Sequence, residues 1–198
     1  MKNELLQCAE NYLNLIDTQY KIVVGRKGQK KTILLEFSAD EFIHISGLHK
    51  IKDNTVIRTA AREKVFRDIL SEKIGFDKIR KSPAFHTIEE RLHYAAHLEE
   101  ILDNNRLVFG YNKKQAAFSK ITADYLMDSV YDDRNIYIFI AGQKDGNAYY
   151  CRSFFPKGDK DYTVGQVKYS LLYKEKIQKS TGRSVIQYNR LREKESED

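Results

Sequence analysis

The stretch FSADEFIHISGLHKIKD, residues 37–53, determines how the rest of this chain is organised. Ser38 followed three residues later by Glu41 is a capping-box signature, which predicts a short helix that begins at Ala39. Gly47 is expected to end this helix, because glycine adopts the left-handed backbone conformation at no steric cost. We therefore expect a helical turn and an exit loop, with strand-like sequence before them and helix-like sequence after them.

Two histidines in this stretch are the main candidates for chemistry. His44 falls one turn after Asp40, whose carboxylate is placed to hold the imidazole in one tautomer. His49 and Lys50 follow in the exit loop. The alternative is that His44 is a half-buried helix residue and His49 a solvated loop residue, since most histidines are structural.

The run FIHISGLHKIKD, residues 42–53, resembles the signature of a family found in phages, prophages and other mobile elements. This is the fourth phage nuclease family assigned to the barnase–EndoU–colicin–RelE (BECR) fold. A strand that ends in LEF, a later helix that carries Ile88, Glu89 and Arg91, and an aromatic, basic C-terminal third fit the same pattern. The resemblance covers residues 20–188 and implies an α+β domain that cleaves or binds RNA. It implies no catalytic set.

Length and composition agree with a compact basic protein. The 198 residues suit one domain or two small lobes, at ~100–200 residues per domain. The net charge of +6 and the pI of about 9.1 permit attraction to phosphate backbones. Cys8 and Cys151 lie in apolar surroundings and are predicted to be reduced, buried thiols. No apolar run approaches the ~20 residues that span a bilayer, so we expect a cytoplasmic protein.

Hydrophobic periodicity divides the chain into a helical part and a strand-rich part. We predict an α+β fold, with a mainly helical N-terminal half that contains a β-hairpin and a C-terminal antiparallel sheet of the BECR ribonuclease type. The parts are residues 1–105, residues 106–191 and a frayed tail, residues 192–198, with the first two packed as one unit. Predicted helices span 3–18, 59–74 and 83–102, and predicted strands span 20–26, 32–37, 107–111, 118–125, 135–142, 148–155, 167–177 and 184–189, with a turn at Asp145 and Gly146.

Basic residues gather in two places. Between Lys50 and Lys81 there are ten basic and five acidic residues, which predicts a basic surface around Lys52 and Arg62. In the strand 167–177, regular alternation places lysines on one face and tyrosines on the other. Such a face suits RNA, although a face kept soluble by lysine is the alternative. The RNA-binding candidates are Lys52, Arg62, Arg91, Lys168, Tyr173, Lys174 and Lys176.

RNA cleavage without a metal requires few groups. A base accepts the proton of the 2′-hydroxyl, cations stabilise the phosphorane, and an acid protonates the 5′-oxygen. The candidates are His44 or His49 as base or acid, Lys50 and Arg152 as charge stabilisers, and Tyr162 or Tyr173 as a further proton donor. We favour His44 over His49, because it lies on a capped helix, and histidine suits proton transfer because its unperturbed pKa is near neutral pH. The sequence leaves open which histidine is the base and which the acid.

We assign no metal and no cofactor from the sequence. His93 and His97 are four residues apart on a predicted helix, a spacing that can hold a metal, but HYAAH lacks the glutamate of a zinc protease. There is also no Gly-x-Ser-x-Gly, no phosphate-binding loop and no dinucleotide glycine fingerprint.

Two functions from different classes remain open at this level. The first is a phage or mobile-element ribonuclease that cuts a host RNA by metal-independent transesterification, as a toxin or in counter-defence, including against a CRISPR guide RNA. The second is a non-catalytic basic protein that inhibits a host nucleoprotein such as a CRISPR effector. Both have RNA as a partner, free or within a host ribonucleoprotein. Convergence of the candidate residues on one cleft would favour the enzyme.

Overall fold

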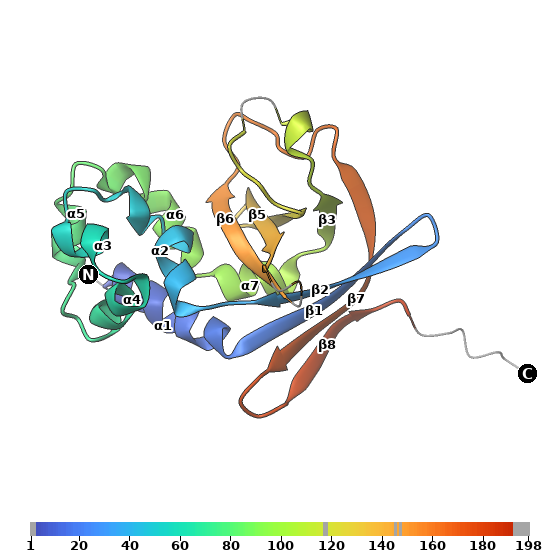
Figure 1. Cartoon of the computed structure of the whole chain (residues 1–198), viewed down its shortest axis with the longest axis horizontal. Coiled ribbons are helices and arrows are strands. Elements are labelled where there is room, and N and C mark those ends of the chain that lie inside the picture. The colour runs from blue at the N-terminus through green and yellow to red at the C-terminus, as the bar shows by residue number, and fades with distance from the viewer. Residues whose placement is uncertain (1–2, 117–118, 145, 147, 192–198) are drawn as a thin grey trace, which may run out of the picture.

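The computed structural model describes residues 3–116, 119–144, 146 and 148–191. Helices gather at one end of the molecule and strands at the other (Figure 1). The predicted α+β class is therefore confirmed. Among the described residues no helix combines the length and apolar character needed to cross a bilayer.

The helical part consists of short helices. The predicted helix 59–74 is shorter in the structure, where α4 forms, and the predicted helix 83–102 is broken between α6 and α7. This break lets α6 pack on β6 while α7 packs on β4. The helices are α1 (Glu4–Ile16), α2 (Phe42–Ile45), α3 (Thr55–Thr59), α4 (Arg62–Leu70), α5 (Phe76–Arg80), α6 (Glu89–Ala95) and α7 (Leu98–Asn104), with 3-10 turns at Ala39–Glu41, Leu48–Lys50, Phe85–Thr87 and Lys113–Gln115.

The strands close into a barrel rather than an open sheet. Their order is β1-β2-β6-β5-β4-β3-β7-β8, and β1 also pairs with β7. The early hairpin is thereby part of the same sheet as the C-terminal strands. β2 pairs with β6 in parallel, and the other pairings between described strands are antiparallel. The strands are β1 (Thr18–Arg26), β2 (Gln29–Glu36), β3 (Leu107–Gly110), β4 (Tyr125–Tyr131), β5 (Arg134–Gly142), β6 (Tyr149–Pro156), β7 (Val167–Gln178) and β8 (Ser184–Asn189).

Two hairpins turn on two residues with positive φ. Lys27 and Gly28 connect β1 to β2, and Asp132 and Asp133 connect β4 to β5. Positive φ at both central residues is the geometry of a type I′ turn, which matches the twist of the flanking strands.

The predicted strand at 118–125 is wrong. The strand in this region is β4, which begins at Tyr125, the last residue of the predicted strand, and ends at Tyr131. Asp128 interrupts the apolar pattern of β4, and its carboxylate accepts a hydrogen bond from the Asn135 amide at 2.9 Å. Phe118, at the start of the predicted strand, lies outside the described residues, as do Asp145 of the predicted turn and the tail 192–198.

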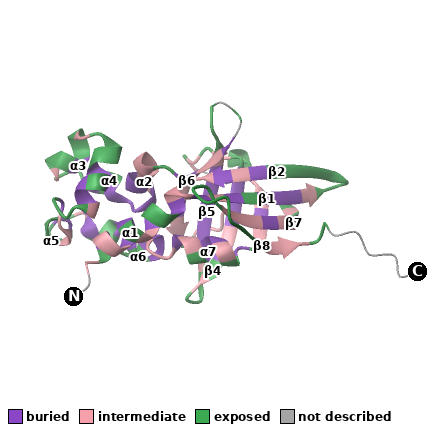
Figure 2. Cartoon of the chain, turned by 90° about the horizontal axis from the view of Figure 1, so that it is seen from below, coloured by how far each residue is buried: buried purple, intermediate pink, exposed green. Residues whose placement is uncertain are grey.

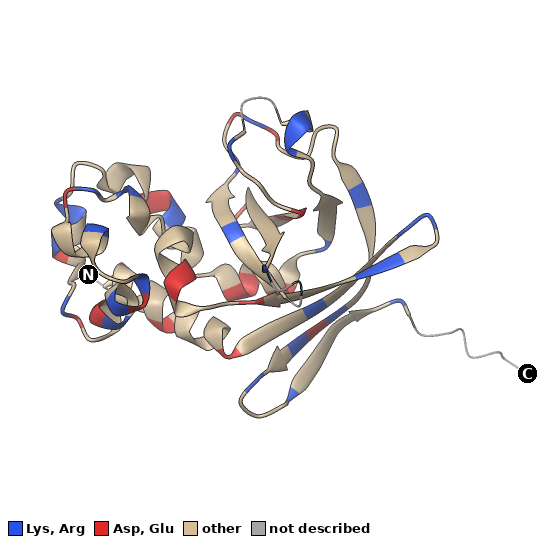
Figure 3. Cartoon of the chain, in the orientation of Figure 1, with Lys and Arg blue, Asp and Glu red and all other residues tan. Residues whose placement is uncertain are grey.

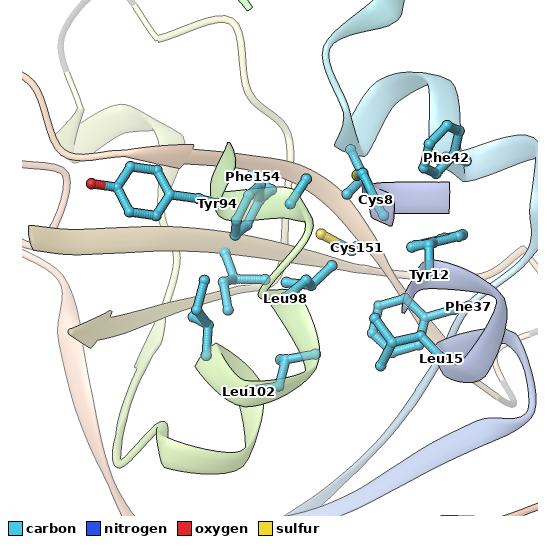
Figure 4. Close-up of a cluster of buried hydrophobic side chains, with 14 of the residues drawn as sticks. Cys8, Tyr12, Leu15, Phe37, Phe42, Tyr94, Leu98, Leu102, Cys151 and Phe154 are labelled. Atoms are coloured by element: carbon cyan, nitrogen blue, oxygen red, sulfur yellow. The ribbon is translucent and has the colours of Figure 1, made fainter. Parts of the chain in front are cut away.

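One continuous core joins the two parts. Buried residues run along the faces where helices and strands meet (Figure 2). Tyr12 lies in this core beside Phe37 and Phe42, with Cys8 nearby (Figure 4). The Tyr12 hydroxyl donates to the Ser38 carbonyl at 3.0 Å, which ties the start of the 37–53 segment to α1. Cys8 and Cys151 are both free and buried, as predicted.

Candidate active site

The segment 37–53 begins and ends as its local signals predict. The Ser38 N–H donates to the Glu41 carboxylate at 3.1 Å within a capping box, and a 3-10 turn leads into α2. Gly47 has a φ of 84°. A Cβ on Gly47 would lie 3.0 Å from Cδ of Arg91, closer than most real contacts. Glycine therefore serves two needs here, the left-handed turn and the close approach of α6.

The buried side chain of Arg91 packs against this turn and hydrogen-bonds it. Its side chain is 8% exposed, and its Nε donates to the Ile45 carbonyl at the end of α2, at 2.9 Å. Burial lowers the pKa of Arg91 to about 10, so it stays charged at neutral pH. The prediction that Arg91 contacts RNA is wrong, because a buried guanidinium that bonds a backbone carbonyl is not available to a ligand.

The two histidines of the segment face each other. The ring centroids of His44 and His49 are 4.8 Å apart, with the ring planes at 44°. Nδ1 of His49 lies 3.3 Å from the Ile43 carbonyl oxygen, so in the neutral ring Nδ1 carries the proton and Nε2 is free to accept one. Asp40 does not orient His44 as we expected. It accepts a hydrogen bond from the Ser38 hydroxyl at 2.6 Å and acts on His44 through its charge alone.

The histidine pair lines a cationic pocket of about 350 Å³ between α2, α3 and α4. Lys52, Arg58 and Arg62 contribute its charged groups, and among the described residues its lining includes no carboxylate. Figure 3 shows the basic residues of this helical end. Apolar side chains complete the wall: Ile43, Ile51, Ile57 and Ala60. A pocket of this size and charge suits a phosphate group with part of its nucleotide.

Arg58 was not a candidate in the sequence analysis. It lies four residues before Arg62, a spacing that places two side chains on one face of a continuous helix. Here the chain breaks between α3 and α4, yet both side chains line the pocket. The sequence signal that could have identified Arg58 is the i, i+4 spacing of two arginines in a basic region.

Desolvation and surrounding cations keep both imidazoles neutral. Burial is the largest cause of the lowered pKa of His44, and the charges of Arg62, Arg152 and Arg91 act in the same direction. Arg152 is an exposed residue of β6, the strand on which α2 packs. Burial likewise lowers the pKa of His49 to about 4. Both rings are therefore proton acceptors at pH 7.

The structure brings seven of the predicted site residues to this region. Not all of them line the pocket. Lys50 does not, and its Nζ donates to the Thr87 carbonyl at 3.3 Å. The seven are His44, His49, Lys50, Lys52, Arg62, Arg91 and Arg152.

Tyr162 is not part of this region. It packs in a separate aromatic cluster with Tyr137, Phe139 and Phe155, where burial raises its pKa. We therefore correct its assignment as a proton donor for the histidine pocket.

The predicted basic face of β7 is also wrong. Leu172 is an extra residue in the pairing of β7 with β1, where Tyr173 is opposite Val23 and Leu171 opposite Val24. This bulge reverses the alternation, so Lys168 is exposed while Lys174 points inward. Lys174 is 1% exposed, and its ammonium donates to the carbonyls of Leu102, Asp103 and Asn105.

The other two β7 candidates have partners within the protein. Lys176 forms ion pairs with Glu99 at 2.7 Å and Asp103 at 2.8 Å. The Tyr173 hydroxyl donates to Glu175 at 2.9 Å. These contacts leave neither side chain free for RNA in this conformation.

Within the described ranges, no group of three or more His, Cys, Asp and Glu side chains is arranged to hold a metal ion. His93 and His97 have ring centroids 5.5 Å apart. The His97 ring stacks on Tyr131 at 4.9 Å, so this pair belongs to an aromatic contact between the end of β4 and the chain from α6 to the start of α7.

The fold and the pocket define a nuclease-like protein: an α+β domain whose paired histidines lie among cations in a site of nucleotide size. A family model described as phage-Barnase-EndoU-ColicinE5/D-RelE like nuclease4 matches residues 4–191. The chain belongs to this family, which confirms the resemblance of the 42–53 run. No curated protein and no solved structure matches the chain.

The lowered pKa of His49 predicts a pH dependence of stability. Between about pH 6.5 and pH 4 the unfolded chain binds a proton at His49 that the folded chain does not. The free energy of unfolding should therefore fall as the pH is lowered through this window. Urea unfolding at several pH values should show a shallower fall for His49→Gln than for the parent. Equal slopes for the two proteins would contradict the assignment.

Proposed function

We propose that the pocket formed by α2, α3 and α4 cleaves RNA by general acid–base transesterification without a metal ion. The observation that carries the proposal is the pair of neutral imidazoles 4.8 Å apart in a pocket whose other charged lining is cationic. Membership of a nuclease family supports phosphodiester cleavage in general.

Each group has a role that follows from its charge and place. Neutral His44 accepts the proton of the 2′-hydroxyl, and this requirement selects RNA over DNA. Arg58, Arg62 and Lys52 hold the phosphate and stabilise the charge of the phosphorane, with Arg152 supporting from β6. A bound phosphate anion raises the pKa of His49, so that its free Nε2 takes up a proton from solvent. His49 then donates this proton to the leaving 5′-oxygen, while His44 keeps the proton of the 2′-hydroxyl until it is released to solvent.

We further propose that the target is a host RNA in the bacterial cytoplasm. The description of the family as phage-like nucleases supports a role as a toxin or in counter-defence. Within that role, a guide RNA held by a CRISPR effector is one target to examine.

The test is incubation of the full chain with total bacterial RNA, and with guide RNA bound to its effector, in the presence of EDTA. We expect fragments that end in 2′,3′-cyclic phosphate, the product of attack by the 2′-hydroxyl. Intact RNA in both samples would overturn the proposal. Stable association with the RNA or the effector, without cleavage, would instead favour an inhibitor of a nucleoprotein.

A further inference from the structure

A second basic hollow, of about 500 Å³, lies on the barrel where β3 and β8 meet along β7. It shares no lining residue with the histidine pocket. The strands that form it are at the end of the molecule away from α2, α3 and α4 (Figure 1). Its lining consists of Arg106, Lys168, Tyr169, Ser170, Leu171, Tyr188 and Arg190.

The strand topology creates this hollow. β3 and β8 pair with the same side of β7, β3 as far as Tyr169 and β8 from Tyr173 onward. Between these pairings no described strand pairs with Ser170 or Leu171 on that side. The N–H of Arg190 donates to the Leu172 carbonyl at 2.7 Å, which holds the end of β8 against the gap. The result is a notch in the sheet, which we call the β7 notch.

The β7 notch has an uncompensated positive charge. Arg106, Lys168 and Arg190 are exposed, and the lining has no carboxylate among the described residues. None of the three forms an ion pair within the described part of the chain, whereas Lys176, further along β7, has two acidic partners. Cations that the fold leaves without counter-ions attract an anion.

An aromatic ring lies directly beside these cations. The Arg106 guanidinium is 5.2 Å from the centroid of the Tyr188 ring, and Tyr188 is half-buried against the core. A ring anchored by packing loses little entropy when a base stacks on it. Basic groups next to such a ring are the usual combination in sites for single-stranded nucleic acid.

We propose that the β7 notch binds an unpaired segment of the single-stranded RNA whose cleavage is proposed for the histidine pocket. Arg106, Lys168 and Arg190 contact its phosphates, and one base stacks on Tyr188. The volume lies within the ~300–1,000 Å³ usual for ligand pockets. The inference rests on the proposed function for the identity of the strand. It adds a second contact point, so that a long RNA binds across the barrel while its scissile phosphate lies at His44.

The test uses the full chain and a single-stranded RNA with every 2′-hydroxyl methylated, which binds but cannot undergo transesterification. Fluorescence anisotropy over a range of salt concentrations reports affinity and its salt dependence. The variant Arg106→Gln, Lys168→Gln, Arg190→Gln should reduce the slope of log affinity against log salt by about 2, at ~0.7 per phosphate contact. Tyr188→Leu should weaken binding about fivefold or more, and Tyr188→Phe should restore it.

A matched control changes three exposed lysines outside both pockets and outside the 50–81 basic region, in the variant Lys120→Gln, Lys144→Gln, Lys179→Gln, which should alter the salt slope less than the notch variant does. Unchanged affinity and slope in the notch variants, or failure of the parent to bind the analogue, would overturn the inference. Cleavage of a dinucleotide, too short to reach the notch, should be the same in notch variants and parent. Binding through the notch without cleavage of any RNA would leave this inference intact and overturn the proposed function.

Discussion

Replacement of His44 by alanine is expected to slow RNA cleavage at least about 100-fold, the usual contribution of a positioned acid–base group. The imidazole lines the pocket and its pKa is lowered by burial and by three neighbouring arginines, so it is a proton acceptor at pH 7. Because the neutral ring adds no charge to the pocket, affinity for RNA should change by no more than about twofold. Initial rates and binding to the methylated RNA measure the two effects separately.

His93→Ala is the matched control for this experiment. His93 is an exposed histidine on α6 whose ring contacts Tyr94 and His97, outside the pocket lining. The His93→Ala variant should cleave RNA at the parental rate. Cleavage by His44→Ala at the parental rate would remove His44 from the mechanism, whereas loss of cleavage together with loss of folded structure would require His44→Gln as the conservative variant.

Lys174→Met is expected to lower the free energy of unfolding by about 3 kcal/mol or more, at ~1–3 kcal/mol for each buried polar group left unsatisfied. The Lys174 ammonium satisfies the carbonyls of Leu102, Asp103 and Asn105 at the C-terminus of α7. Burial lowers the pKa of Lys174 to about 7, while the Asp103 charge opposes the shift. Methionine has similar bulk but no donor, so the carbonyls of Asp103 and Asn105 would lose this partner, and the Leu102 carbonyl would keep only the Asn105 N–H at 3.1 Å.

Buried charges can often be replaced by apolar groups at no cost when both partners are removed. Both partners cannot be removed here, because the partners of Lys174 are backbone carbonyls, which no side-chain substitution deletes. Urea unfolding monitored by circular dichroism measures the effect, with Lys168→Met as the exposed control on the same strand. A difference between the two variants of less than about 0.5 kcal/mol would show that water reaches the α7 terminus.

The sequence by itself determined the features that depend on neighbours along the chain. The capping box at Ser38 and Glu41, the left-handed turn at Gly47 and the helical position of His44 all follow from contacts within a few residues. Strands β5 and β8 and helix α1 were predicted to within two residues, since their periodicity is strong. The family resemblance also came from this local run.

Only the tertiary structure decided which of the candidate residues share a site. Arg58, Arg62 and Arg152 come from three elements, α3, α4 and β6. They come near His44 because α4 packs on α2 and α3, and α2 packs on β6. One bulge at Leu172 separated Lys168 from Lys174, because a shift of one residue moves a strand's side chains to the opposite face. Closure of the barrel by β1 and β7 joins residues more than a hundred positions apart. Such pairings depend on the shape and burial of distant segments, which no local pattern records.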